Sequence, residues 1–474
     1  MRIAIIGGGI SGLSAAYYLE QARAAGAPVE YTLFESSDRL GGVMFSDKIG
    51  DCVVEGGPDS FLTEKPWANQ LCAELGIAND LIGSNDSQRI TYILVKGRLV
   101  PMPDGLMFMV PTKLIPTALT SLFSWSTKFK MLGELLHPPR PVGKDETVAQ
   151  MVERHFGAEV VDRLADPLLS GVYGGDAASL SVRAVLPKFV EMEEHYGSLC
   201  RAMLAGRKKL AAMRKAKGYA PKPLFSSLKG GMQQMIDAIV ARLNPQSLRM
   251  STTVDQLKRK DGGWELLTLR GPEHFDAVIF ATPAWVASKM LSAIDTQLSE
   301  DLGKVEYSSS ITVTLGYLRD QLKSCLPGFG FLVPRSEGTR MLATTFVHTK
   351  FPFRAPDNKA LVRCFLGGAN DPSVLKFSDA EITTVVRKEL KQITGLDADP
   401  WFVKVYRWDR AMAQYTPGHL ERIERIGSTL KQMQNLSIAG NFYKGIGVPD
   451  CIRTGKEAAE HMAALAREGQ AVKA

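Results

Sequence analysis

The sequence predicts an α/β protein that combines a discontinuous, Rossmann-like nucleotide-binding domain with a mixed-sheet domain and a helical domain. Two observations predict the first of these: a strand, a glycine-rich turn and a helix at residues 2–17, and a second strand–glycine–helix unit at residues 436–467. A third observation is a series of apolar strands between them. With 474 residues, 45% of them hydrophobic, the chain is too long for one compact core.

The N-terminal turn has the spacing of a dinucleotide site. Gly7 allows a tight turn after a buried strand, Gly9 lets the backbone approach a pyrophosphate, and Gly12 lets the helix pack closely. The free N–H groups of the helix N-terminus attract the phosphates. The predicted phosphate-binding residues are Gly7, Gly8, Gly9, Ile10, Ser11 and Gly12.

A second apolar strand, residues 29–34, ends at Glu35, where a carboxylate is expected to bind a ribose hydroxyl. Glu35 disfavours NADP because it repels a 2′-phosphate, but it does not separate NAD from FAD. The following residues do, since Arg39 can reach the phosphates and the small Gly41 and Gly42 let the chain pass close to the cofactor. Together these residues predict FAD.

Composition excludes several other classes of protein. The charged content of 23% and aromatic content of 8% are globular values. The six cysteines contain no C-x-x-C pair and the seven histidines no metal-ligand spacing, so we expect neither disulfides nor a metal. The basic segment 201–222 lacks interleaved aromatic residues, which argues against nucleic acid. It is interpreted as a solvated helix face, or alternatively as a site for an anionic membrane or a carboxylated substrate.

The first residues start a strand directly, and no apolar stretch reaches the roughly 18 residues of a spanning helix. We therefore expect a cytoplasmic protein, with peripheral attachment to the inner face of the membrane as an alternative. Residues 101–136 bear on this choice because they are apolar and rich in proline. They predict a buried helical layer or a membrane-surface patch.

The rest of the chain completes the domain plan. The turn formed by Gly57, Pro58, Asp59 and Ser60 is either a connector or a segment that lies against the flavin ring. Residues 166–176 predict a helix end that runs into a glycine-rich loop, and residues 276–281, 311–317, 330–333 and 361–366 predict strands. The predicted domains are an FAD-binding domain (1–62, 224–285 and 430–470), a substrate-binding domain (63–90 and 286–429) and a helical domain (91–223).

These motifs resemble those of the protoporphyrinogen oxidase and coproporphyrinogen III oxidase family, within the amine-oxidase-like FAD superfamily. The resemblance covers nearly the whole chain. The superfamily motifs are residues 7–12, 35–42 and 440–452, and the more specific ones are residues 57–61, 167–176, 328–334, 351–356 and 441–445.

The resemblance implies that FAD and O2 oxidise a porphyrinogen to a porphyrin in haem biosynthesis, with six electrons removed in three rounds and H2O2 formed. No acid–base side chain is expected to be catalytic. The family's flavin contacts carry over to Gly7–Gly12, Glu35, Gly57–Ser60, Val254, Trp408, Ile446, Gly447 and Val448. Its substrate positions carry over to Leu332 and Phe365, with Phe329 beside them, and its carbonyl loop to Gly171 and Gly174.

One position departs from the family pattern. Many members have an arginine that pairs with a substrate propionate, whereas this chain has Thr91 there. Lys96, Arg98 or the basic segment are alternative anion partners. The departure is similar to the Gram-positive type, whose usual substrate is coproporphyrinogen III with four propionates, so both porphyrinogens stay open. Ferrochelatase or other haem-pathway enzymes are possible partners by the same resemblance, and the chain is either a monomer or a dimer.

Two other functions remain as alternatives. The shared FAD motifs alone allow another amine oxidase or a desaturase of the superfamily. The lack of acid–base residues allows a non-enzymatic flavin or porphyrin carrier.

Overall fold

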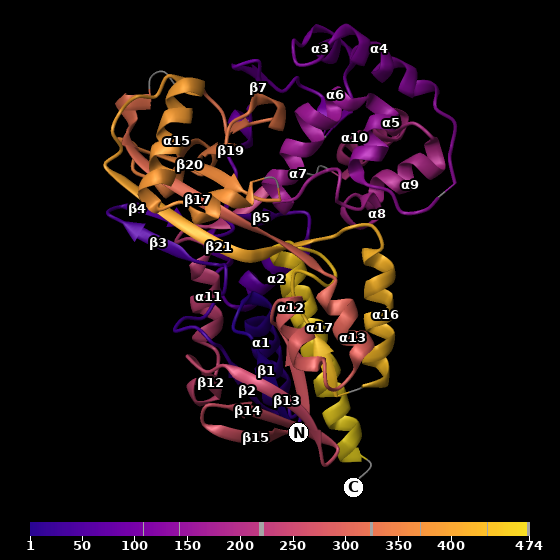
Figure 1. Ribbon diagram of the computed structural model, residues 1–474, viewed down its shortest axis with the longest axis vertical. Coiled ribbons are helices and arrows are strands. Elements are labelled where there is room, and N and C mark those ends of the chain that lie inside the picture. The colour runs from indigo at the N-terminus through magenta and orange to yellow at the C-terminus, as the bar shows by residue number, and fades with distance from the viewer. Residues whose placement is uncertain are drawn as a thin grey trace. The chain divides into compact units, whose positions relative to one another are not determined.

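The computed structural model describes residues 1–107, 109–141, 143–217, 222–322, 326–369, 371–433 and 435–471 (Figure 1). It divides into two compact units. Unit 1 contains Met1–Gly83, Leu224–Glu306 and Glu421–Ala474, and unit 2 contains Ser84–Pro223 and Tyr307–Leu420. The predicted FAD-binding domain falls within unit 1. Unit 2 contains most residues of the other two predicted domains, and the three-domain division remains a prediction.

A parallel five-stranded sheet forms the centre of unit 1, as the apolar strands predicted. Its strand order is β12-β2-β1-β16-β22, and all neighbours run parallel. The strands are β1 (Arg2–Ile6), β2 (Glu30–Phe34), β12 (Leu248–Arg249), β16 (Ala277–Phe280) and β22 (Leu436–Ile438). The first and last thirds of the chain therefore meet in one sheet.

Helices α1 (Ile10–Ala24) and α17 (Val448–Ala471) pack together in the core of unit 1. Gly455 makes their close approach possible, because a Cβ there would lie 2.3 Å from the carbonyl oxygen of Ser11. The other helices of unit 1 are α2 (Pro66–Glu74), α11 (Gln233–Val240), α12 (Ala284–Leu291) and α13 (Thr296–Gly303), and α16 (His419–Gln432) begins at the unit boundary.

Three small antiparallel sheets complete unit 1. They are β3 (Ser46–Ile49) with β4 (Cys52–Glu55), β5 (Phe61–Leu62) with β11 (Phe225–Leu228) and β6 (Leu81–Gly83), and β13 (Val254–Lys260) with β14 (Gly263–Thr268) and β15 (Gly271–Phe275).

Unit 2 contains the predicted mixed sheet, which has seven strands in the order β21-β17-β20-β19-β18-β7-β8. The sheet is mixed because β18 pairs with β7 in parallel and with β19 antiparallel. One face packs against α15 (Asp379–Thr394) through Ile382, Val386 and Leu390 (Figure 1). The strands are β7 (Thr91–Val95), β8 (Arg98–Pro101), β17 (Glu306–Leu318), β18 (Gly330–Leu332), β19 (Met341–Phe346), β20 (Lys359–Gly367) and β21 (Phe402–Gln414).

The helical part of unit 2 follows the β9–β10 hairpin, Leu106–Met107 with Val110–Pro111. Its helices are α3 (Leu114–Leu119), α4 (Trp125–Gly133), α5 (Val148–Phe156), α6 (Ala158–Val160), α7 (Asp166–Tyr173), α8 (Val182–Val185), α9 (Pro187–Tyr196) and α10 (Leu199–Lys217), and α14 (Val347–Lys350) lies beside the sheet. Residues 218–221 of the basic segment, and Phe108 of the apolar one, lie outside the described residues.

The predicted buried layer at residues 101–136 is only partly buried. Leu122 and Phe123 are in the core, but Leu119 is 81% exposed and Trp125 69% exposed. The buried-layer alternative therefore holds for Leu122 and Phe123 but not for Leu119, at the end of α3, or Trp125, at the start of α4. For these two residues the surface-patch alternative stays open. No described helix is both long and apolar enough to cross a membrane.

Candidate functional site

The turn between β1 and α1 is held by glycines that have no room for a side chain. Gly7 has a φ of +109°, and a Cβ there would lie 2.6 Å from the carbonyl oxygen of Ala281. A Cβ at Gly12 would lie 1.9 Å from the carbonyl oxygen of Gly7. The helix therefore begins directly against the end of the strand, as the motif predicts.

Gly9 is different, because a Cβ built there meets no protein atom within 4 Å. Gly9 is also the N-cap of α1, and no side chain among the described residues caps this helix end. The backbone N–H groups of the first helical turn, which includes Ile10 and Ser11, therefore border open space. An uncapped helix N-terminus with free space beside it fits the pyrophosphate of a dinucleotide.

Glu35 follows β2, and its carboxylate is already positioned by protein donors. Its Oε2 accepts from the Gly8 N–H at 2.7 Å, and its Oε1 accepts from the N–H and the hydroxyl of Ser37 at 2.8 Å each. The Thr252 N–H donates to the Glu35 carbonyl at 2.8 Å, two residues before the buried Val254. The fold thus brings the predicted ribose residue and the segment of Val254 together.

The paired glycines after Glu35 lie against the first turn. The Gly41 N–H donates to the Gly8 carbonyl at 2.8 Å, and a Cβ at Gly42 would lie 3.2 Å from the Cα of Gly9. Arg39 instead donates to the carbonyl of Gly42, and its guanidinium lies 4.9 Å from the ring centroid of Phe45. Its phosphate contact remains a prediction.

The turn at residues 57–60 reaches the same region of unit 1. A Cβ at Gly57 would lie 1.7 Å from the carbonyl oxygen of Val43, one residue after the paired glycines. The Ser227 hydroxyl donates to the carbonyl of Asp59 at 2.6 Å, and the Ser60 hydroxyl donates to the Asp59 carboxylate at 2.6 Å. Pro58 lies between Gly57 and Asp59, and both of these residues are held by the contacts just described, so the turn has a defined path.

The C-terminal segment meets the residues that follow this turn through an ion pair that sequence reasoning missed. Asp450, in the first turn of α17, accepts from the Gly447 N–H at 3.2 Å and pairs with Lys65. The pair ties Ile446, Gly447 and Val448 to the segment after residue 60. An acidic residue in the first turn of a helix was the only available signal for Asp450. Trp408, the other predicted flavin contact, is half-buried on β21 of unit 2.

The predicted substrate residues share one face of the unit 2 sheet, opposite α15. Leu332 pairs with Ala343, and Ala343 pairs with Phe365, so their side chains lie in one row. Gly171 of α7 lies beside this row, since a Cβ there would be 3.9 Å from Cδ2 of Leu332. Phe329 is buried just before β18. The structure thus brings Leu332, Phe365 and Gly171 together.

Gly174 ends α7 with a φ of +58° and opens the predicted carbonyl loop. Its carbonyl accepts from the Ala369 N–H at 3.0 Å, which leaves one lone pair for another donor. The Gln414 amide holds the loop by donating to the Tyr173 carbonyl at 2.8 Å. Thr91 begins β7 and pairs with Gly330, one step along the face from Leu332.

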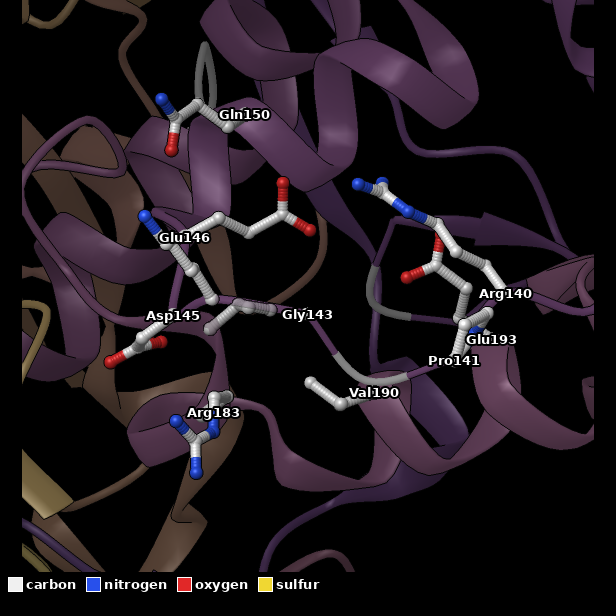
Figure 2. Close-up of a pocket in the computed structure, with 11 residues that line it drawn as sticks. Arg140, Pro141, Gly143, Asp145, Glu146, Gln150, Arg183, Val190 and Glu193 are labelled. Carbon is white, nitrogen blue, oxygen red and sulfur yellow. The ribbon is translucent and has the colours of Figure 1, made fainter. Parts of the chain in front are cut away.

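A cavity of about 550 Å³ lies elsewhere in unit 2, between residues 140–141 and 143–146 and helices α5, α8 and α9 (Figure 2). Its walls are charged, with Arg140, Glu146 and Arg183 around it. Glu146 and Glu193 both pair with Arg154. Sites for large apolar ligands have apolar walls and a few polar groups, so this cavity suits such a ligand poorly.

Glu134, His137 and His155 each place one potential metal ligand atom within 4.8 Å of the others. Both ring nitrogens of His155 face carboxylates, Glu134 at 3.0 Å and Glu193 at 3.1 Å. Burial lowers the pKa of His155, but the hydrogen bonds to the two carboxylates, together with their negative charges, outweigh burial and raise it. Burial raises the pKa of Glu134, but hydrogen bonds led by that of His155 lower it to about 2. The cluster is therefore interpreted as a buried ion-pair network.

Comparison with known proteins gives a consistent match along the chain. Residues 10–463 match the family described as flavin containing amine oxidoreductase. The chain is 32% identical to the coproporphyrinogen III oxidase of Bacillus subtilis, over 96% of this chain and 97% of that protein. It is 30% identical to the chloroplastic protoporphyrinogen oxidase of Nicotiana tabacum, over 97% of this chain and 84% of that protein.

Solved structures give the same result. A crystal structure assigned as a protoporphyrinogen oxidase from Exiguobacterium sp. 255-15 superposes with a TM-score of 0.86 at 30% identity, covering 98% of both chains. The cyclohexylamine oxidase of Brevibacterium oxydans superposes with a TM-score of 0.69 at 16% identity, covering 99% of both chains, and shares the fold alone.

Proposed function

This chain belongs to the family of flavin-containing amine oxidoreductases, and from that premise we propose that it oxidises a porphyrinogen to the corresponding porphyrin in haem biosynthesis. The predicted α/β fold, FAD cofactor and oxidoreductase class are confirmed by the family match and the named relatives. The observation that carries the proposal is the apolar row of Leu332, Ala343 and Phe365 with Gly171 beside it.

When bound, FAD would supply the redox chemistry: three two-electron oxidations of the porphyrinogen, balanced by the reduction of three O2 to three H2O2. We assign its pyrophosphate to the N-terminus of α1 and its ribose to Glu35. The side chains of unit 2 bind and orient the macrocycle. Leu332 and Phe365 provide apolar contact with its rings, while the carbonyl of Gly174 offers an acceptor for a pyrrole N–H.

Of the two porphyrinogens, coproporphyrinogen III is favoured. The relatives from Bacillus subtilis and Staphylococcus aureus that carry its name are 32% identical to this chain, against 30% for the Nicotiana protoporphyrinogen oxidase and for the Exiguobacterium structure. Thr91, in place of the family's arginine, agrees with this choice. Because coproporphyrinogen III has four carboxylates, its binding site needs cationic side chains in addition to the apolar and carbonyl contacts named above.

The experiment is an aerobic incubation of the purified flavoprotein with each porphyrinogen, followed by porphyrin fluorescence. Porphyrin formation above the autoxidation rate is expected for coproporphyrinogen III, with slower turnover of protoporphyrinogen IX. Amines serve as the matched alternative substrates, and peroxide release is the readout. Peroxide release with amines, without any acceleration by porphyrinogens, would instead favour an amine oxidase.

A peripheral membrane contact is part of the proposal. Trp125, Phe129 and Leu132 follow one side of α4 and are 69%, 68% and 48% exposed. Lys128 lies 4.5 Å from the Trp125 ring centroid, so a cation accompanies the apolar side chains. This combination suits an anionic lipid surface. Contact with ferrochelatase or other haem-pathway enzymes, and the choice between monomer and dimer, remain predictions.

A further inference from the structure

A buried arginine that sequence reasoning missed lies on the substrate face of the unit 2 sheet. Arg363 is two residues before Phe365 on β20, so both side chains point to the same side of the sheet. The guanidinium carbon lies 5.0 Å from the Phe365 ring centroid, and the residue is only 3% exposed. Arg363 therefore places a permanent positive charge beside a predicted substrate contact.

The strand register gives this face two adjacent rows with different chemistry. The first row contains Leu332, Ala343 and Phe365 and is apolar. The second row is formed by Thr91, Gly330, Thr345, Arg363 and Thr314, in which each residue pairs with the next across neighbouring strands. Among these residues Arg363 is the charged one, and its strand neighbours are threonines.

The second row also contains Thr91, the position at which the family pattern has an arginine. Arg363 lies three strand spacings from Thr91, which is about 14 Å. The positive charge of Arg363 therefore lies on the same row as Thr91 but on a different strand. The alternative cations Lys96 and Arg98 are exposed at the β7–β8 turn, where the Lys96 N–H donates to Glu337 at 2.6 Å.

We propose that Arg363 binds a carboxylate of the porphyrinogen and thereby selects carboxylated macrocycles, an inference that rests on the proposed function. A guanidinium is suited to this task because its planar set of donors matches a carboxylate with two parallel hydrogen bonds. The apolar row beside it excludes water, which strengthens the interaction. Arg363 is a binding residue, and the redox step does not require it.

The experiment compares the wild-type flavoprotein with Arg363→Met and Arg363→Lys on two substrates, coproporphyrinogen III and its neutral tetramethyl ester. Arg363→Met is expected to lower kcat/KM for the acid by about tenfold to a hundredfold, mainly through KM, because one charge-assisted interaction is lost. With the ester the same substitution should have little effect. Arg363→Lys should recover part of the loss, since it keeps the charge but not the planar donor set.

Arg387→Met is the matched control, because Arg387 is an arginine of the same unit on α15, which covers the opposite face of the sheet. It should leave the acid-to-ester ratio unchanged. Flavin content and thermal unfolding show whether each variant is folded. If Arg363→Met does not fold, the wild type and Arg363→Lys still decide the matter: equal kcat/KM for acid and ester in both would overturn the proposal.

The outcomes separate the two levels of inference. A wild type that oxidises neither substrate overturns the proposed function and this inference together. A wild type that oxidises coproporphyrinogen III, with an acid-to-ester ratio that Arg363→Met leaves unchanged, overturns the role of Arg363 alone. Loss of activity toward the acid but not the ester supports it.

Discussion

Gly9 is a position at which the proposed ligand, and not the packing of the protein, requires a glycine. Gly9→Val should reduce FAD retention strongly, because the side chain would enter the space assigned to the pyrophosphate, while its Cβ would meet no protein atom within 4 Å. The measurement is the flavin-to-protein absorbance ratio of the purified variant. Gly12→Val is the contrast, since its side chain would collide with the Gly7 carbonyl and should impair folding itself. A folded Gly9→Val protein with a full complement of flavin contradicts the assignment.

Leu332 tests the substrate face. Leu332→Ala should raise KM for the porphyrinogen by about tenfold, since the lost apolar contact is worth about 1–2 kcal/mol. Flavin content should stay at the wild-type level, because Leu332 belongs to unit 2 and the pyrophosphate site to unit 1. Steady-state kinetics and the flavin absorbance ratio measure the two effects. Equal loss of substrate and flavin binding counts against this role.

Single residues differed in how well the sequence predicted them. The backbone path of the glycine turn and the place of Glu35 directly after β2 follow from the spacing of the motif, whereas their contacts with FAD stay predictions. Arg363 and the Lys65–Asp450 pair depend on strand register and on contacts between distant segments. No local pattern carries that information, so the structure was needed to find them.

Most elements around the site were predictable because their residue patterns are strong. The buried strands β1 and β16 are continuous apolar runs, and the helix of Met235, Ile236 and Ile239 has a clear apolar side. The exposure of α4 was not predictable. Its buried Met131 and exposed Phe129 look alike in a hydropathy profile, and only packing decides which of them is covered.

The ion-pair network of His155 should make the stability of unit 2 depend on pH. The pKa of His155 is raised above its ordinary value, so its contribution to stability is present below about pH 6.5 and is lost as the pH rises through the raised pKa. The pKa of Glu134 falls from 4.5 to about 2, so its contribution is present above pH 4.5 and is lost as the pH falls toward 2. The network is therefore strongest between these limits.

His155→Gln should lower the apparent stability by about 3 kcal/mol in that window, because it leaves two buried carboxylates without their shared cation. The loss should shrink at alkaline pH. Thermal unfolding over a pH series measures both effects. His195→Gln, on the exposed side of α9, is the control and should leave the profile unchanged. A loss that does not vary with pH argues against a charged His155.

Helix α4 provides the test of membrane contact. Wild-type protein should sediment with vesicles that contain anionic lipid, and the double substitution Trp125→Ser with Phe129→Ser should reduce this binding by about tenfold or more. Leu269→Ser is the control, since Leu269 is 93% exposed but lies in unit 1. Absence of wild-type sedimentation, or an equal effect of Leu269→Ser, would remove the proposed contact.

At the scale of the whole molecule, the proposed cofactor site of unit 1 is assembled from three separated segments of the chain. The N-terminal turn, the strand after residue 276 and the C-terminal unit meet because β1, β16 and β22 are neighbours in one parallel sheet. The sequence predicted this discontinuity because each end of the chain carries its own strand–glycine–helix unit. The unit 2 sheet was predicted only as a set of strands, since strand order depends on long-range pairing.

The central claim is that the porphyrinogen is oxidised by the flavin of this chain and is not merely bound by it. The most direct measurement is the flavin absorbance of the purified protein during anaerobic addition of coproporphyrinogen III. The expected result is bleaching of the oxidised flavin as porphyrin forms, with return of its absorbance when O2 is admitted. A flavin that stays oxidised in the presence of bound porphyrinogen would contradict the claim and identify the protein as a carrier.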